Sequence, residues 1–140
     1  MLRTIQIVFL IWCLVGQTTL ILGDNLIHCL SYEPMSIKLE GKIKRHSFQD
    51  FNGKETSRYW VLHLLQPVCI RGNNDGINEE EKDITKLQLV LSPEQYRTYQ
   101  SYVNIDVFVT GKLFHGHSAH HYTPVLLEVG NIKPRSSDLR

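Results

Sequence analysis

Alternation of apolar and polar side chains is the feature that most constrains this chain. Residues 35–45 read MSIKLEGKIKR, and the apolar positions of one face are Met35, Ile37, Leu39 and Ile43. A period of two residues is typical of a half-buried β-strand. Gly41 falls on the same face, where a glycine often marks a bend of the sheet. Shorter segments of the same kind predict four more strands, at residues 59–65, 87–91, 105–113 and 124–129.

One helix is predicted between the third and fourth of these strands. Ser92, Pro93 and Gln95 form a capping box with proline at the first helical position. The apolar stripe that follows comprises Tyr96, Tyr99 and Val103. The order β-β-β-α-β-β is that of the OB-fold. We therefore expect a mainly β protein, a small five-stranded OB-like barrel with one helix between strands 3 and 4. The alternative is an α+β roll with the helix laid across the sheet.

The N-terminus resembles an export signal. Arg3 is followed by the apolar run IVFLIWCLVG at residues 7–16, which is the length of a signal-peptide core. We expect residues 1–23 to be a signal peptide, with an uncleaved membrane anchor as the alternative. Residues 24–134 then form a single domain, and residues 135–140 form a flexible tail. The expected location is exported, either periplasmic or secreted, and contact with a membrane is expected only if the leader is uncleaved.

Cysteine number and charge narrow the classes of function. Cys13 lies in the leader, so Cys29 and Cys69 remain, and an even number in a small exported domain predicts a disulfide. Two buried free thiols are the alternative. The chain has 15 basic and 14 acidic residues, and removal of the leader with Arg3 leaves equal numbers. Without an overall positive charge, a nucleic-acid partner is not expected.

Four histidines lie between the last two predicted strands: His115, His117, His120 and His121. If the alternation continues past Leu113 without a bulge, three of them point to the inner side, and His120 points to the other. Three imidazoles and a water would suit zinc or copper. This set (His115, His117 and His121) is the metal-binding alternative, and no other cofactor is expected. A polar recognition surface and a plain hairpin turn are the other two interpretations.

Other candidate sites are weaker. Tyr59 and Tyr122 are candidates for exposed ligand contacts, whereas Trp60 shares the phase of a core face. Histidine pairs can act as acid and base in hydrolysis, but the sequence identifies no nucleophile, so no catalytic residue is assigned and a histidine-dependent hydrolase stays an alternative. The acidic segment RGNNDGINEEEK is not an EF-hand, because Lys82 stands where the bidentate glutamate is required.

Four motifs together resemble an exported bacterial family classed as a domain of unknown function. They are a Cys-x-x-Tyr-x-Pro start at residues 29–34, GKI in the first strand at 41–43, YWVLHLLQPVC at 59–69, and VTGKLFHGHSAHHYTPVLL at 109–127. The resemblance covers residues 29–129. It implies a small, exported, β-rich domain in which the histidine segment is a family feature, and it implies no reaction.

These observations favour a binding protein. We expect an exported module, not an enzyme, that engages a protein or an envelope polysaccharide through the histidine segment, as an inhibitor or immunity protein would. The expected ligand contacts are His115, His117, His120, His121, Tyr59 and Tyr122. The sequence leaves the oligomeric state open.

Overall fold

The computed structural model describes residues 29–49 and 52–136. The predicted leader, residues 1–23, and the last part of the predicted tail, residues 137–140, lie outside these ranges. Among the described residues, no helix has the length and apolar character needed to cross a membrane. The strands are β1 (Leu30–Ser31), β2 (Ser36–Gln49), β3 (Glu55–Arg71), β4 (Glu81–Val90), β5 (Asp106–His115) and β6 (Val125–Pro134). The helix α1 (Pro93–Thr98) is followed by a 3-10 turn (Gln100–Tyr102).

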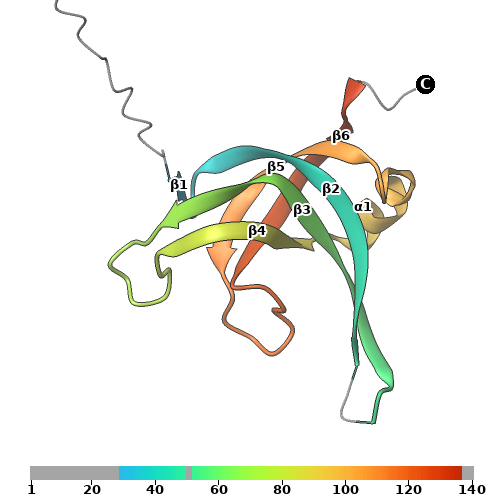
Figure 1. The fold of residues 1–140 in the computed structure, drawn as a ribbon, viewed down its shortest axis with the longest axis horizontal. Helices are drawn as coiled ribbons and strands as arrows, with labels where there is room; N and C mark the ends of the chain where they lie inside the picture. Colours follow the sequence, from blue (N-terminus) through green and yellow to red (C-terminus); the bar gives the residue numbers. More distant parts are fainter. Residues whose placement is uncertain (1–28, 50–51, 137–140) are drawn as a thin grey trace, which may run out of the picture.

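The protein is mainly β, with one six-stranded mixed sheet and one short helix. The order of strands is β1-β3-β2-β5-β6-β4, and β3 also pairs with β4. Hydrogen bonds therefore run in a ring through five strands, β3-β2-β5-β6-β4, and back to β3. Figure 1 shows how these strands curve around one another. Most pairs are antiparallel, whereas β4 with β6 and β1 with β3 are parallel. The five ring strands and the helix follow one another in the order predicted from the sequence.

The boundaries of several strands differ from the prediction. The predicted strands end at residue 45 and begin again at residue 59, but β2 continues to Gln49 and β3 begins at Glu55. The adjoining ends of the two strands, residues 45–49 and 55–60, extend from the ring as a two-stranded arm (Figure 1). Backbone pairing holds this arm, so its outer part needs no alternation of apolar residues. β3 also continues past Pro67, which sits in an irregular stretch of the β3–β4 ladder, a position where proline is tolerated. The two-residue β1 is too short to show a period.

Two glycines lie where strands of the ring approach each other most closely. A Cβ atom on Gly41 would lie 2.3 Å from the carbonyl oxygen of His63. A Cβ atom on Gly111, at the register shift of the β5–β6 pair, would lie 2.1 Å from the carbonyl oxygen of Glu128. Any side chain at either position would force the backbones apart, so these glycines permit the tight bend of the sheet.

The hydrophobic core lies on the inner side of the ring. It includes Ile43, Leu62, Leu87, Val109 and Leu127, all essentially inaccessible to solvent. Trp60 is 6% exposed and belongs to the core, as its phase in the sequence predicts. Two other buried side chains, Val61 and Leu126, do not belong to this cluster. They alternate with core residues along their strands, so they lie on the outer face of the sheet, and something else must cover them.

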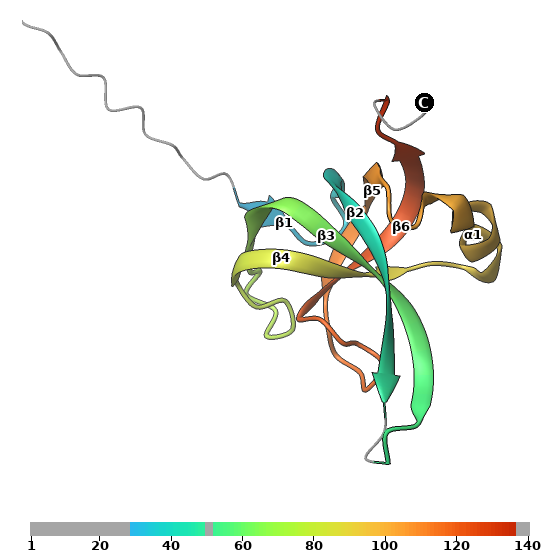
Figure 2. The ribbon, with the colours of Figure 1, turned by 45° about the vertical axis from the view of Figure 1, so that its right-hand side comes forward.

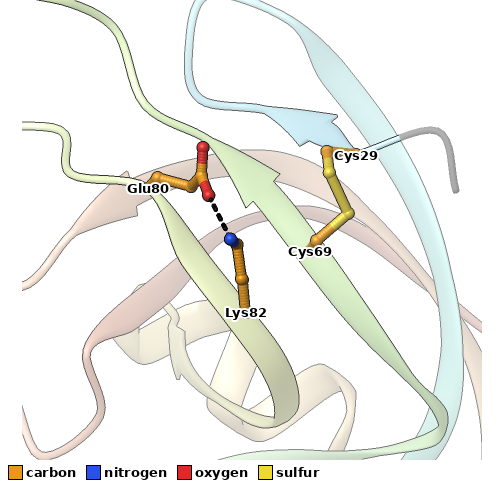
Figure 3. Close-up of a disulfide and its surroundings, with 4 residues drawn as sticks. All are labelled: Cys29, Cys69, Glu80 and Lys82. Carbon is orange, nitrogen blue, oxygen red and sulfur yellow. Dashed lines mark ion pairs between the residues drawn. A yellow bond between two sulfur atoms is a disulfide. The ribbon is translucent and has the colours of Figure 1, made fainter.

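The predicted disulfide between Cys29 and Cys69 is present, with 4.7 Å between the two Cα atoms. It fastens the start of the described chain to the end of β3 beside the parallel β1–β3 pair (Figure 3). An ion pair between Glu80 and Lys82, 3.0 Å long, lies close by at the start of β4.

The helix is capped as predicted. The Ser92 side chain accepts the backbone N–H of Gln95, and the Gln95 side chain accepts the backbone N–H of Ser92. The Gln95 amide also donates to the carbonyl oxygen of Val129 at 2.8 Å, which attaches α1 to β6. Tyr96 packs edge-on against Trp60, with 4.9 Å between ring centroids.

Candidate functional site

Residues 116–124, called the His loop below, connect β5 to β6, and the buried side chain of Gln88 fixes their path. The Gln88 side-chain nitrogen donates to the carbonyl oxygen of His120 at 3.0 Å. Its side-chain oxygen accepts the backbone N–H of Tyr122 at 2.7 Å. The Gln88 backbone N–H donates to the hydroxyl of Thr123 at 3.0 Å. Three hydrogen bonds from one residue of β4 therefore hold the loop against the outer face of the sheet.

Apolar contacts beneath the loop explain why part of the outer face is buried. Leu126 pairs in register with both Gln88 and Phe114, and it is fully buried. A Cβ atom on Gly116 would lie 3.3 Å from both the Leu126 side chain and the Cβ of His121, so the loop passes directly over Leu126. The loop thus replaces water over an apolar patch that would otherwise be exposed.

The structure brings His117 and His121 together. The backbone N–H of His117 donates to Nδ1 of His121 at 2.9 Å, and the two rings meet edge to face with centroids 4.9 Å apart. Both rings pack against Phe114, at 6.1 and 5.6 Å between centroids. Burial, with the nearby His117 and His120, lowers the pKa of His121. The pair lies on the Phe114 side of the strand, whereas His115, the next residue of β5, takes the other side.

His115 has separate partners. Its Nε2 lies 3.1 Å from Oε1 of Glu81 at the start of β4, and its Nδ1 lies 3.1 Å from the carbonyl oxygen of Gly116. The Tyr32 ring contacts it edge-on. The expected convergence of three imidazoles depended on β5 continuing past His115. The strand ends there, so the alternation stops and His117 follows the loop.

The hydrogen bonds define which ring nitrogens are free for other ligands. Both nitrogens of His115 lie within hydrogen-bond distance of an acceptor oxygen, so neither is without a partner. Nδ1 of His121 accepts the His117 N–H. His117 donates from Nδ1 to the carbonyl oxygen of His115 at 3.0 Å, which leaves its Nε2 lone pair unshared. Within the part of the chain that the structure describes, no group of three or more His, Cys, Asp or Glu residues has the arrangement of a metal site.

A row of rings continues from the loop along the arm. Tyr122 stacks on Phe48 and on Tyr59, with centroids 5.0 and 4.4 Å apart. Tyr59 stacks in turn on His46, its partner across the strands, and His46 stacks on His63. We call these five residues the aromatic row. The Tyr122 hydroxyl also shares a hydrogen bond of 2.7 Å with the hydroxyl of Ser57, so the His loop and the arm form one continuous surface.

Lys44 and Lys86 place positive charge beside the far end of the row, which is formed by His46 and His63. Nε2 of His46 and Nε2 of His63 share a hydrogen bond of 3.1 Å. The pKa of His63 is lowered, chiefly by burial and then by the charges of Lys86, His46 and Lys44. His63 therefore becomes neutral at a lower pH than an exposed histidine would. In the middle of the row, Tyr59 has a raised pKa because it is partly buried and lies beside Tyr122.

The structure places the predicted contact residues in two environments. His117 and His120 are exposed, whereas Tyr59, Tyr122 and His121 are half-buried in packed contacts. Sequence reasoning missed Gln88, Glu81, Phe48, His46 and His63. A glutamine within the apolar segment LQLVL was the one available signal for Gln88, since a polar residue at a buried position needs partners. The other four belong to pairings between distant segments, which leave no local pattern.

Comparison with known proteins gives a family without an assigned activity. Residues 86–133 match the family model of DUF4431, a domain of unknown function. The matched segment runs from the middle of β4 through α1, β5 and the His loop to β6. The arm and the disulfide lie outside it. No curated protein matches the sequence.

Proposed function

We propose that this chain is an exported binding module that acts without turnover. Its ring of strands is an OB-like barrel, and the resemblance to the exported family extends over residues 29–129. The ligand is a protein or an envelope polysaccharide, and a periplasmic or secreted location agrees with the disulfide, since disulfides persist in oxidising compartments.

The contact between the His loop and the arm carries this proposal. OB-folds bind their ligands with one face of strands 2 and 3 and with the loops that join strands 1 to 2 and 4 to 5. When the five ring strands are numbered in chain order, from β2 as strand 1 to β6 as strand 5, the arm is the connection between strands 1 and 2, and the His loop is the connection between strands 4 and 5. Tyr122 joins them by stacking on Phe48 and Tyr59. The two connections that correspond to the binding loops of the fold class thus contact each other in this protein, and their ribbons lie close together in Figure 2.

The composition of this surface suits recognition. Stacked aromatic rings provide contact area that loses little conformational entropy on binding, since their positions are already fixed. The exposed imidazoles of His117 and His120 add hydrogen-bond donors and acceptors beside them. Gln88 holds the loop backbone, so the histidines are presented in a defined geometry before the ligand arrives.

The hydrogen bonds favour recognition over the zinc or copper alternative. Both ring nitrogens of His115 and Nδ1 of His121 are engaged in hydrogen bonds, and His115 lies on the other side of the strand from His117 and His121, so a three-histidine site needs a rearranged loop. Metal binding stays a prediction, and zinc titration of wild type, His117→Ala and His121→Ala tests it. Tight stoichiometric binding that both substitutions remove would support that alternative over ours.

The direct test compares binding by matched variants. The protein, produced from the full-length chain and recovered oxidised and untagged, is immobilised and exposed to an envelope extract, and bound proteins and polysaccharides are identified. A single purified partner is then titrated. We expect the double variant His117→Ala/His120→Ala and the variant Tyr122→Ala each to weaken its binding by tenfold or more.

The control for this experiment is Lys133→Gln, an exposed position on β6 away from the His loop. It should bind as wild type does. Equal affinity of all variants for the purified partner would contradict the proposal, because the His loop and the aromatic row would then lie outside the interface.

A further inference from the structure

We propose that a second site, on the other face of the arm, binds a small sugar acid or sugar phosphate. The site is a cleft of about 440 Å³ between the arm and the helical segment, within the range of small-molecule sites, roughly 300–1,000 Å³. Its lining residues are Arg45, Arg58, Tyr59, Trp60, Tyr96 and Gln100. The common chemistry of the two ligand classes is an oxyanion attached to a hydroxylated ring.

The charged residues that line the cleft are both arginines. Arg45 is exposed and makes no ion pair with any residue in 29–49 or 52–136. Arg58 donates from Nε to Glu55, which leaves the other N–H groups of its guanidinium available. Guanidinium groups bind carboxylates and phosphates through paired hydrogen bonds. The cleft therefore favours an anion.

Aromatic rings form the apolar part of the cleft. Trp60 is almost fully buried, and Tyr96 packs edge-on against it at 4.9 Å between centroids. This pair offers an apolar wall to the carbon skeleton of a ring. The exposed amide of Gln100 adds donors and an acceptor for hydroxyl groups. A bare inorganic anion would leave this wall unused.

The walls are held in place before a ligand binds. On one side, α1 is fixed by its capping box and by the hydrogen bond from Gln95 to the carbonyl oxygen of Val129. The following turn is fixed by a hydrogen bond of 3.1 Å between the Tyr99 hydroxyl and Asn131. On the other side, Arg45 and Trp60 are paired across β2 and β3. The backbone of both walls is therefore fixed before binding, and ordering is confined to the exposed side chains of Arg45, Arg58 and Gln100.

The site is independent of the His loop. Arg45 and Trp60 occupy one face of the arm, and His46, the next residue of β2, belongs to the aromatic row on the opposite face. Tyr59 is the single member of the aromatic row that also lines the cleft. Failure of either proposal would leave the other standing.

Isothermal titration at low ionic strength tests the second site. The oxidised, untagged protein from the full-length chain is titrated with glucuronate, glucose 6-phosphate, glucose and inorganic phosphate. We expect at least one anionic sugar to bind with one-to-one stoichiometry, and both glucose and phosphate to bind at least tenfold more weakly. The preferred anionic sugar identifies carboxylate or phosphate as the recognised group.

Variants locate the binding. Arg45→Gln should weaken affinity by roughly tenfold to a hundredfold, the usual effect of losing a hydrogen bond to a charged group. Lys133→Gln should leave it unchanged. The indole N–H resonance of Trp60 should shift on titration in wild type. The proposal is overturned if neither anionic sugar binds, if glucose or inorganic phosphate binds equally well, or if Arg45→Gln and Lys133→Gln behave alike.

Discussion

The side-chain oxygen of Gln88 accepts the backbone N–H of Tyr122 at 2.7 Å, across a sequence separation of 34 residues. The same side chain donates to the carbonyl oxygen of His120. The loop forms backbone hydrogen bonds of its own, from Gly116 to Pro124 and from His121 to Ser118, but the backbone groups of His120 and Tyr122 find their partner on a strand that the loop crosses. The position of Tyr122, and with it the stacking of the His loop on the arm, therefore depends on one buried amide.

Replacing Gln88 with leucine tests that dependence. The substitution preserves approximate volume but leaves the Tyr122 N–H and the His120 carbonyl without partners. We expect a loss of about 2–3 kcal/mol in the free energy of unfolding, since each unsatisfied group costs about 1–3 kcal/mol and the loop relaxes in part. Urea denaturation measures the loss, and hydrogen exchange at the Tyr122 amide should accelerate. Gln66→Leu, at an exposed position of β3, is the control. Equal losses of stability in the two variants would show that the Gln88 hydrogen bonds do not hold the His loop.

The stacking of Tyr122 on Tyr59 should appear as a coupling energy. In a double-mutant cycle with Tyr59→Ala and Tyr122→Ala, we expect about 0.5–1.5 kcal/mol of interaction, the usual value for aromatic pairs. The cycle is measured by urea denaturation. Tyr122→Phe should retain most of this energy and lose only the hydrogen bond to Ser57. Additive effects of the two alanine substitutions would mean that the rings do not stack in solution.

Stability should fall as pH is lowered through the histidine range. His63 and His121 have lowered pKa values in the folded protein, so the unfolded chain binds more protons at intermediate pH. Their contribution is complete above about pH 6.5, the ordinary histidine value, and is lost as pH falls through the lower folded values. His63→Gln and His121→Gln should each flatten the dependence of urea midpoint on pH. Proton NMR should show both midpoints below 6.5; a midpoint above it for either residue would contradict this account.

Removal of the disulfide should cost more than any of these changes. The two cysteines are separated by 40 residues. In the chain-entropy model, closing a loop of this length stabilises by about 4 kcal/mol. Cys29→Ser/Cys69→Ser should lower the free energy of unfolding by about this amount, within the observed range of roughly 2–5 kcal/mol. Wild type in the presence of a reductant should match the double variant, and the reductant should have no effect on the variant. A loss under about 1 kcal/mol would show that residual structure or native strain offsets the entropic effect.

Local patterns were sufficient for the order of the five ring strands and the helix, but not for the full lengths of β2 and β3, for β1 or for the site. The capping box at Ser92 and the alternation around Leu39 depend on residues close in sequence, and both are present as expected. The environment of His115 depends on Glu81, 34 residues away, and on where β5 stops. Neither the Glu81 contact nor the end of β5 can be predicted from the residues of the histidine segment alone.

By itself, the sequence determined the order of the five ring strands and the helix, the core position of Trp60, and the pairing of Cys29 with Cys69. Each follows from the alternation of apolar residues, from the helix capping box or from the number of cysteines, and all of these can be read without knowing the tertiary structure. Only the tertiary structure decided the rest. It separated His115 from His117 and His121, placed Gln88 beneath the His loop and aligned five rings along the arm. Side chains distant in sequence meet there because the strands bend and close into a ring, and that closure is a property of the whole sheet.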